Sequence, residues 1–369
     1  FRRHEIKGLS QHAGFRFDQA ARIVPYLERL GITDLYLSPI LKARAGSTHC
    51  YDVVDYNEVN PELGGEEGLK ALSAELNRRG MGLVVDVVPN HMGIMDEANR
   101  WWWDVLENGP GSPYAPFFDI DWHPPKVELR NRVLLPTLGQ QFGACLEGQE
   151  LRLVFEEGDF LVTYYYKRFP TGPRTWTGLL LPVQETLRAE LPRDHEDLIE
   201  FESILTALHH LPLREEVEPE KIQERQREKE VAKRRLRALI SRSETVRRAI
   251  ERRVEEVNGH PGQPESFDAL ESFLAGQAYR LAFWRTAAEE INYRRFFDIN
   301  ELAAIRVELP EVFKQVHETI FRLIREGVIT GLRVDHPDGL FNPPQYFMDL
   351  QRACYLARIG DELDANEFP

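Results

Sequence analysis

The segment VITGLRVDHPDGL, residues 328–340, places charged side chains in an otherwise apolar strand. Charged residues are rarely buried unless they are paired or used in function. Residues two apart in a strand project from the same side, so Arg333 and Asp335 share one face while Leu332 and Val334 take the other. The turn residues that follow put Asp335 where the strand ends. A carboxylate kept charged there suits a nucleophile or a charge stabiliser, and a purely structural Arg–Asp pair is the alternative.

Polar residues also end a second apolar strand, in GLVVDVVPNHMG at residues 82–93. Asp86 lies within this strand, and Asn90 and His91 follow its terminating Pro89. By alternation Asp86 is expected to point into the same interior as the Arg–Asp pair. A lone aspartate on a buried strand can instead be a structural hydrogen-bond acceptor, and Asn90 and His91 could cap a turn or donate to a sugar hydroxyl.

A third polar segment, LKARAGSTHCYDVVDYNEVNPELGG at residues 41–65, follows the preceding apolar strand. It is rich in glycine and polar residues and carries the pair Tyr51-Asp52, with His49 nearby. Such loops carry function more often than packing. Three strand ends therefore each supply an aspartate or a histidine.

The types of side chain at these strand ends exclude several kinds of reaction. No cluster of cysteine and histidine has metal-ligand spacing, and no GxSxG motif offers a serine nucleophile. Carboxylates, an arginine, histidines and aromatic rings remain, which is the set that glycosyl transfer uses. We expect neither a metal nor an organic cofactor.

One pattern positions these residues: an amphipathic helix, a glycine, an apolar strand and a proline. It occurs at residues 18–39, 66–89 and 311–337, with Asp18 predicted as the first N-cap and Gly31 as the first helix terminator. Alternating helices and strands predict parallel βα units. No GxGxxG or P-loop follows any of the strands, and polar strand ends favour a (β/α)8 TIM barrel.

The spacing of these copies predicts three parts. Residues 1–92 form the first part of the barrel, residues 93–290 a large, mainly helical insertion, and residues 291–369 the continuation that holds the nucleophile strand. The barrel is expected to be truncated after about the fourth strand. In the insertion we expect an aromatic loop, a β-hairpin turning at Gly158-Asp159, and charged, solvated helices.

Composition excludes several classes of partner. The net charge of −14 argues against nucleic acid and against an anionic membrane surface, and no apolar run approaches the length of a membrane span. Three scattered cysteines make no disulfide framework, which favours a reducing cytoplasm. The sequence does not determine the oligomeric state.

The aromatic run WWW at residues 101–103 has two interpretations. These tryptophans could stack on sugar rings, or they could belong to the hydrophobic core.

Two motifs carry a resemblance to a known family. DVVPNH, residues 86–91, and GLRVDH, residues 331–336, resemble the first and second signature regions of the α-amylase family of glycoside hydrolases. Longer segments such as WWWDVLENGPGSPYAPFFDIDW, INYRRFFDINELAAIRVELPEVF and GLRVDHPDGLFNPPQYF resemble the maltooligosyltrehalose synthases within that family. The resemblance covers most of residues 15–350.

The resemblance implies intramolecular transglucosylation, in which the reducing-end α-1,4 bond of a maltooligosaccharide becomes an α,α-1,1 bond. Asp335 matches the catalytic nucleophile and Arg333 the arginine beside it. The residues that match the family's substrate-binding positions are Tyr51, Asp52, Asp86, Asn90, His91 and His336. The alternatives are an α-glucan hydrolase or another transglycosylase of the family, and an inactive carbohydrate-binding fragment.

The sequence also departs from the family pattern. The expected general-acid glutamate should follow soon after residue 350, yet Glu362 and Glu367 lack a strand-like apolar context and are not assigned. The chain is therefore expected to be an N-terminal half. Its first residues lack the usual first-strand motif, so that strand is expected to be replaced or lost. Cys50 stands where the family has glycine and is expected to strain the loop that presents Tyr51.

Overall fold

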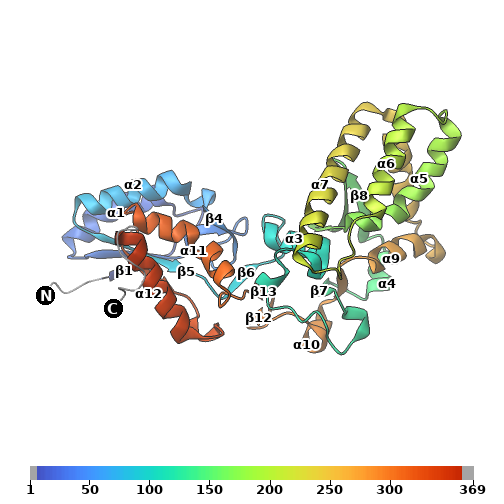
Figure 1. Cartoon of the computed structure of the whole chain (residues 1–369). Helices are drawn as coiled ribbons and strands as arrows, with labels where there is room; N and C mark the ends of the chain where they lie inside the picture. The colour runs from blue at the N-terminus through green and yellow to red at the C-terminus, as the bar shows by residue number, and fades with distance from the viewer. Residues whose placement is uncertain (1–5, 360–369) are drawn as a thin grey trace. The chain divides into compact units, whose positions relative to one another are not determined.

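A computed structural model describes residues 6–359. The chain divides into two compact units (Figure 1). The first unit consists of the residues up to 99, residues 117–119 and the residues from 295 onward. The second unit consists of residues 100–116 and 120–294. No helix within residues 6–359 combines the length and the apolar character needed to cross a bilayer.

The first unit is built on a four-stranded parallel sheet. Its strands, in spatial order, are β1 (Ile6–Leu9), β2 (Asp34–Leu37), β5 (Gly82–Val87) and β14 (Gly331–Val334). The predicted α/β architecture with parallel strands is confirmed, whereas closure into an eight-stranded barrel stays a prediction. The first strand is not lost, because the segment IKGL forms β1 and pairs with β2.

Four helices accompany this sheet: α1 (Phe17–Arg29), α2 (Gly65–Arg78), α11 (Pro310–Arg325) and α12 (Pro343–Ile359). The predicted terminator Gly31 follows α1 at φ 82°, a left-handed conformation that only glycine adopts readily. The predicted N-cap is wrong. Arg16 occupies the N-cap position and Asp18 lies in the first turn, where its charge complements the helix dipole.

The two faces of the sheet differ in polarity. On one face Leu35, Leu83 and Val85 are fully buried, and on β14 Leu332 and Val334 pack against the core of α11 and α12. The opposite face carries Tyr36, Asp86 and Arg333. This is the alternation predicted for β14, and it collects the polar side chains of three strands on one side.

Short strands follow the carboxyl ends of the parallel sheet. β3 (Leu41–Ala43) pairs with β4 (Val53–Val59) in the antiparallel sense. β6 (His91–Gly93) pairs with β13 (Ile299–Ala304), which also pairs with β12 (Arg295–Phe296). The pairing of β6 with β13 joins segments about 200 residues apart in the sequence and so places residues near 300 beside the end of β5.

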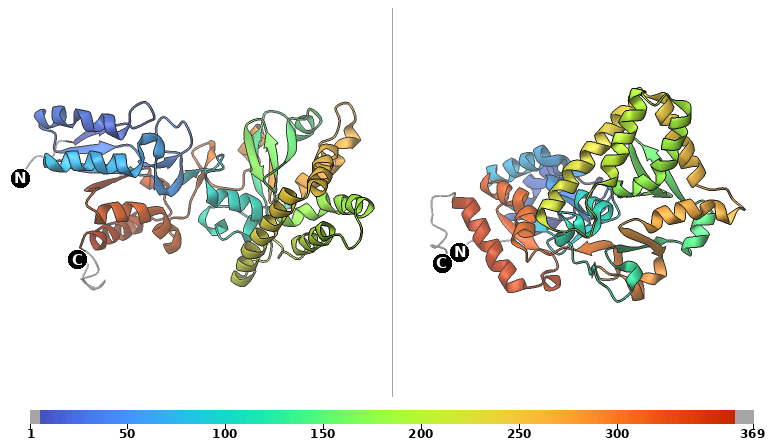
Figure 2. Two further views of the ribbon diagram at one scale, coloured as in Figure 1. Left: turned by 90° about the horizontal axis from the view of Figure 1, so that it is seen from above. Right: turned by 45° about the vertical axis from the view of Figure 1, so that its right-hand side comes forward.

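The second unit combines short sheets with a group of helices. β7 (Val133–Leu138) pairs with β11 (Tyr279–Phe283), and β8 (Leu151–Glu156), β9 (Asp159–Tyr164) and β10 (Lys167–Pro170) form an antiparallel sheet. The helices are α3 (Arg100–Asn108), α4 (Phe142–Glu147), α5 (Trp176–Glu190), α6 (Glu196–His209), α7 (Pro219–Arg242), α8 (Glu244–Val257), α9 (Asp268–Ala275) and α10 (Ala287–Glu290). Helices α5 to α8 pack beside one another (Figure 2).

The predicted hairpin is confirmed, but its turn is one residue earlier. Glu157 and Gly158 connect β8 to β9, with φ of 51° and 85°. Positive φ at both central residues gives a turn whose twist matches that of the strands.

Two of the three tryptophans in the run at residues 101–103 lie in a core. Trp101 and Trp102 are buried in the second unit, which favours a core role for these two side chains.

The charged helices are not simply solvated. Lys229 on α7 is buried, and its ammonium lies 2.8 Å from Asp104 Oδ2 and pairs with Glu107 on α3. Burial alone would raise the pKa of Glu107, but the charges of Lys233 and Lys229 lower it to about 2. The prediction of a fully solvated excursion is therefore wrong at these positions, because α7 is anchored on α3 by buried ion pairs.

Replacing Lys229 by methionine should lower the free energy of unfolding by about 3 kcal/mol, because Asp104 loses its ion-pair partner and the buried Glu107 keeps only Lys233. Arg227→Met on the same helix is the control, since the Arg227 side chain is 72% exposed. Urea unfolding followed by circular dichroism measures both. Equal stabilities of the two variants would show that the buried pairs do not anchor α7.

His317 should make stability of the first unit depend on pH. This residue is buried, its Nδ1 donates to the Phe313 carbonyl at 2.7 Å, and its Nε2 accepts from the Tyr346 hydroxyl at 2.9 Å. Burial lowers the pKa of His317 to about 4, whereas the unfolded chain titrates near 6.5. The unfolded state therefore binds more protons between these values, and stability falls as the pH drops from about 6.5 to 4, with a slope of ~1.4 kcal/mol per pH unit.

The variant His317→Gln keeps hydrogen-bonding capacity but cannot titrate, so its slope should be shallower by that amount. Urea unfolding at a series of pH values between 7 and 4 gives both slopes. Identical slopes for the parent chain and the variant would rule out His317 as the origin.

Candidate active site

The buried carboxylate of Asp86 is the centre of the polar face. Its Oδ2 accepts hydrogen bonds from the Tyr36 hydroxyl at 2.6 Å, the Tyr51 hydroxyl at 2.7 Å and Arg333 Nη1 at 2.7 Å. The parallel register sets two of these contacts, because it places Arg333 directly beside Asp86 and Tyr36 beside Val84. The other oxygen, Oδ1, is buried and has no partner among residues 6–359.

The electrostatics of this network keep its donors protonated. Burial raises the pKa of Asp86, and the hydrogen bonds from Tyr36 and Tyr51 and the charge of Arg333 oppose that shift. Burial and the neighbouring carboxylate raise the pKa of Tyr51 well above its ordinary value. Burial alone would lower the pKa of Arg333, but its contacts with Asp335 and Asp86 raise it overall. Tyrosines and arginine thus remain donors over the physiological range.

Arg333 joins the buried carboxylate to an accessible one. Its Nη1 also donates to Asp335 Oδ1 at 2.6 Å. The Asp335 amide donates to the Val87 carbonyl at 2.9 Å, which holds Asp335 one residue beyond the end of β14. Asp335 lines a cleft of about 430 Å³ in the first unit. A carboxylate held by a cation at the wall of a cleft can attack an electrophilic carbon or stabilise a positive charge.

The loop after β3 presents Tyr51 and Asp52 to the same cleft. Cys50 has φ 64°, a conformation that side chains rarely adopt, as expected for a position where glycine is usual. Its buried thiol lies 3.6 Å from Asn60 Nδ2. Asp52 accepts from the Ser47 hydroxyl at 2.5 Å. These local contacts hold the loop so that the Tyr51 hydroxyl reaches Asp86.

The histidines occupy two different environments. His91 is fully buried, and its Nε2 lies 3.2 Å from the Tyr51 carbonyl oxygen. The centroid of its ring lies 4.0 Å from the centroid of the Phe296 ring. Asn90 Nδ2 lies 3.3 Å from His91 Nδ1. His336 has φ 46°, and its ring packs edge-on against Phe296. Phe296 therefore separates the two imidazoles and covers one side of each.

The structure brings all eight predicted site residues together in the first unit. Tyr51, Asp52, His91 and Asp335 line the cleft itself. Of the other four, Arg333 and Asp86 support Asp335. Asn90 contacts His91, and His336 contacts Phe296.

Three residues of the site carried little or no signal in the sequence. Tyr36 alternates with buried leucines in β2, so its inward direction could have been deduced from the pattern. Phe296 and Glu301 line the cleft but follow the insertion, and only the pairing of β13 with β6 places them there. Arg44 Nη1 lies 2.5 Å from Glu301 Oε2.

The described part of the cleft contains three carboxylates in its lining: Asp52, Glu301 and Asp335. Asp52 and Glu301 both lie near Arg44, at 3.6 and 2.5 Å. Glu362 and Glu367 lie outside the described residues.

The sequence and the fold are similar to those of known proteins. The model of the alpha-amylase catalytic domain matches residues 21–156. The structure of maltooligosyltrehalose synthase from Arthrobacter ramosus is 35% identical, with a TM-score of 0.65, and the match covers 96% of this chain and 34% of that one. A Mycobacterium tuberculosis protein provisionally named a maltooligosyl trehalose synthase is 33% identical over 354 residues, or 95% of this chain and 32% of the relative.

Shorter segments of the chain match amylases. The intracellular maltogenic amylase of Bacillus subtilis is 40% identical over 99 residues, which is 27% of this chain and 16% of that protein. The chain spans about a third of the length of the synthases, and the match runs through nearly all of its own residues. The chain is thus a homologue of the maltooligosyl trehalose synthases, and its residues 21–156 match the alpha-amylase catalytic domain.

Proposed function

We propose that the chain acts at the reducing end of maltooligosaccharides and converts the last α-1,4 bond into an α,α-1,1 bond. The observation that carries the proposal is the shared guanidinium of Arg333, which contacts both the buried Asp86 and the cleft-lining Asp335. The similarity to the synthases supports the choice of reaction.

In this proposal Asp335 attacks the anomeric carbon of the penultimate sugar, the C1–O4 bond breaks, and a glycosyl ester forms on the carboxylate. The leaving O4 takes up a proton, and the terminal glucose is released into the cleft. That glucose then turns and attacks through its own anomeric hydroxyl, which frees Asp335 and returns the proton. No water is consumed, so the cleft must retain glucose and exclude solvent.

Each supporting residue has a role set by its contacts. Arg333 orients Asp335, and Asp86 holds Arg333. Tyr51, tied to Asp86 through its hydroxyl, offers its ring face to the reacting sugar. In this proposal Asp52 contacts sugar hydroxyls from the wall of the cleft, and the buried His91 supports the main chain at Tyr51. The proton donor for O4 is not assigned within residues 6–359.

The nucleophile can be tested without a proton donor, because fluoride leaves without protonation. Incubation with 5-fluoro-α-D-glucosyl fluoride should break the C1–F bond and form a slowly hydrolysed ester on Asp335. Intact mass spectrometry should then show one added fluoroglucosyl unit, and peptide mapping should place it on Asp335.

Two variants make this experiment decisive. Asp335→Asn should remain unlabelled. Asp338→Asn should be labelled like the parent chain, because the Asp338 side chain is 81% exposed. Labelling of Asp335→Asn, or a label mapped to another residue, would contradict the assignment.

The reaction type is tested by its products from maltopentaose. Isomerisation removes reducing ends without releasing glucose, because the new bond joins two anomeric carbons. Hydrolysis increases reducing ends and releases shorter sugars, which is the activity expected of an α-glucan hydrolase of the same family. A reducing-sugar assay combined with chromatography distinguishes them, with Asp335→Asn as the blank.

A carbohydrate-binding role is the second candidate, because no proton donor for O4 is assigned among residues 6–359. It predicts that calorimetry detects maltopentaose binding while neither product appears and no fluoroglucosyl label forms. Labelling by the fluoride with no turnover of maltopentaose would instead support Asp335 as nucleophile and locate the defect in proton donation.

A further inference from the structure

The lining of the cleft beside Asp335 divides into a charged part and an apolar part. The charged part includes Arg44, Asp52 and Glu301. On the basis of the proposed function, we propose that the apolar part, through Ile299 above all, makes glucose and not water the acceptor of the sugar held on Asp335. This apolar wall consists of Ile94, Met95, Phe296, Ile299 and Leu302.

The apolar wall is built on one small antiparallel sheet. β6 pairs with β13, and the Ile94 amide extends this pairing by donating to the Glu301 carbonyl at 3.0 Å. Phe296 and Ile299 are direct cross-strand partners in β12 and β13, so their side chains lie on the same face of the sheet. Ile299 and Glu301 are two residues apart on β13 and also share a face. The sheet therefore presents an aromatic, an aliphatic and a charged side chain to the cleft together.

The turn that joins β12 to β13 holds Phe297 in an unusual conformation. Phe297 has φ 49°, in the left-handed region that a bulky side chain rarely adopts. The residue is 69% exposed, and the centroid of its ring lies 4.5 Å from that of Phe296 and 5.2 Å from that of His336. Backbone strain of this kind is typical of functional positions. Phe297 thus continues the apolar surface from Phe296 to the residue that follows Asp335.

The exposure of Ile299 leaves apolar surface available to a ligand. Ile299 is 45% exposed, whereas Ile94 in the same wall is 2% exposed. A pyranose ring has C–H groups on its faces and hydroxyl groups around its edge. Its face can therefore cover Ile299 while its hydroxyls bond to Glu301 and Asp52. Covering this apolar surface stabilises a bound glucose, and a water molecule gains nothing comparable from the same contact.

Two acceptors compete for the glycosyl ester on Asp335. With either one, the C1–O bond to the carboxylate breaks and a C1–O bond to the acceptor oxygen forms. The acceptor hydroxyl gives up a proton, which replaces the proton that O4 took up. Glucose yields the α,α-1,1 bond, and water yields a shortened maltooligosaccharide. A glucose seated on the apolar wall occupies the space that water needs to reach C1.

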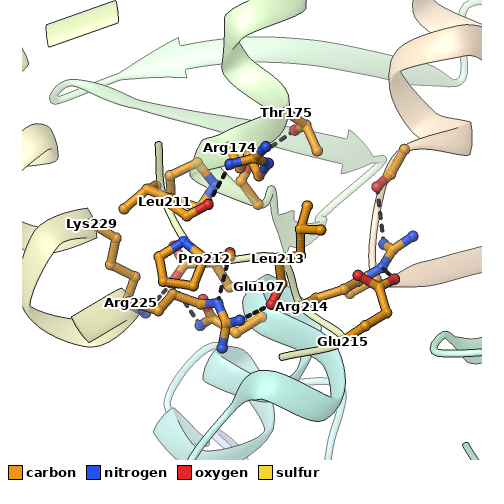
Figure 3. Close-up of a pocket in the computed structure, with 15 residues that line it drawn as sticks. Glu107, Arg174, Thr175, Leu211, Pro212, Leu213, Arg214, Glu215, Arg225 and Lys229 are labelled. Atoms are coloured by element: carbon orange, nitrogen blue, oxygen red, sulfur yellow. Dashed lines mark hydrogen bonds and ion pairs between the residues drawn. The ribbon is translucent and has the colours of Figure 1, made fainter. Parts of the chain in front are cut away.

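A cavity of similar volume in the second unit has a different use (Figure 3). It measures about 390 Å³, against about 430 Å³ for the cleft. Arg174 in its lining donates to the Leu211 carbonyl. Arg225 Nε donates to the Pro212 carbonyl at 3.2 Å. These arginines hold the segment 211–215 in place, so we assign the glucose acceptor to the cleft of the first unit.

The lifetime of the 5-fluoroglucosyl ester on Asp335 measures the competition in the whole chain. The labelled protein is separated from excess 5-fluoro-α-D-glucosyl fluoride and kept in buffer alone or in buffer with glucose. Intact mass spectrometry follows the loss of the label, and chromatography identifies the sugar released. The parent chain should lose its label slowly in buffer and about tenfold faster with glucose, with a fluorinated disaccharide as the product.

Three variants test the apolar wall. Ile299→Ser removes apolar surface and offers water a hydrogen bond, so it should shorten the lifetime in buffer about tenfold and reduce the acceleration by glucose. Ile299→Leu keeps the apolar volume and should behave like the parent chain. Leu30→Ser is the matched control, because Leu30 is 57% exposed at the end of α1 and its replacement should leave the lifetime unchanged.

Equal lifetimes in Ile299→Ser and Leu30→Ser, with the ester present in both, would overturn the role of Ile299 while leaving Asp335 as the nucleophile. A lifetime in Ile299→Leu as short as that in Ile299→Ser would also overturn it, because apolar surface would then not be what excludes water. Absence of the ester from the parent chain would contradict the proposed function itself, and the role of Ile299 with it.

Discussion

The first unit depends on one buried carboxylate. Asp86 receives three hydrogen bonds through a single oxygen, from Tyr36, Tyr51 and Arg333. A buried charge is tolerated only when it is well paired, so each donor is required by the same constraint. Because these donors come from β2, from the loop after β3 and from β14, the carboxylate ties the sheet to the loop that faces the cleft.

The pairing of Asp86 with Arg333 also fixes the position of Asp335 in the cleft. Arg333 cannot leave Asp86 without exposing an uncompensated charge, so its second contact with Asp335 is held in one geometry. The cleft is therefore built in two layers. The sheet residues Asp86 and Arg333 orient Asp335, and the loop residues Tyr51 and Asp52 line the cleft beside it.

The long insertion does not disturb this arrangement, because its two ends are joined by local pairing. β6 and β13 flank it and are hydrogen-bonded to each other, with His91 opposite Ala304. The pairing brings Phe296 and Glu301 beside His91 in the first unit. The second unit has its own core and its own charged contacts, anchored at Lys229 and Glu107.

Periodicity in the sequence was sufficient for the parallel βα units, for the polar face of β14 and for the β8–β9 hairpin, because each depends on alternation and turn residues within a short segment. The eight site residues came from the polar ends of the strands and from the resemblance to the α-amylase family, and the fold brings them together. Tertiary structure alone decided that Asp86 serves three donors, that Phe296 lies between His91 and His336, and that Lys229 is buried, because these contacts join segments far apart in the chain. The periodicity of a segment indicates which face of the element a side chain occupies. Only tertiary packing determines which residues that side chain contacts.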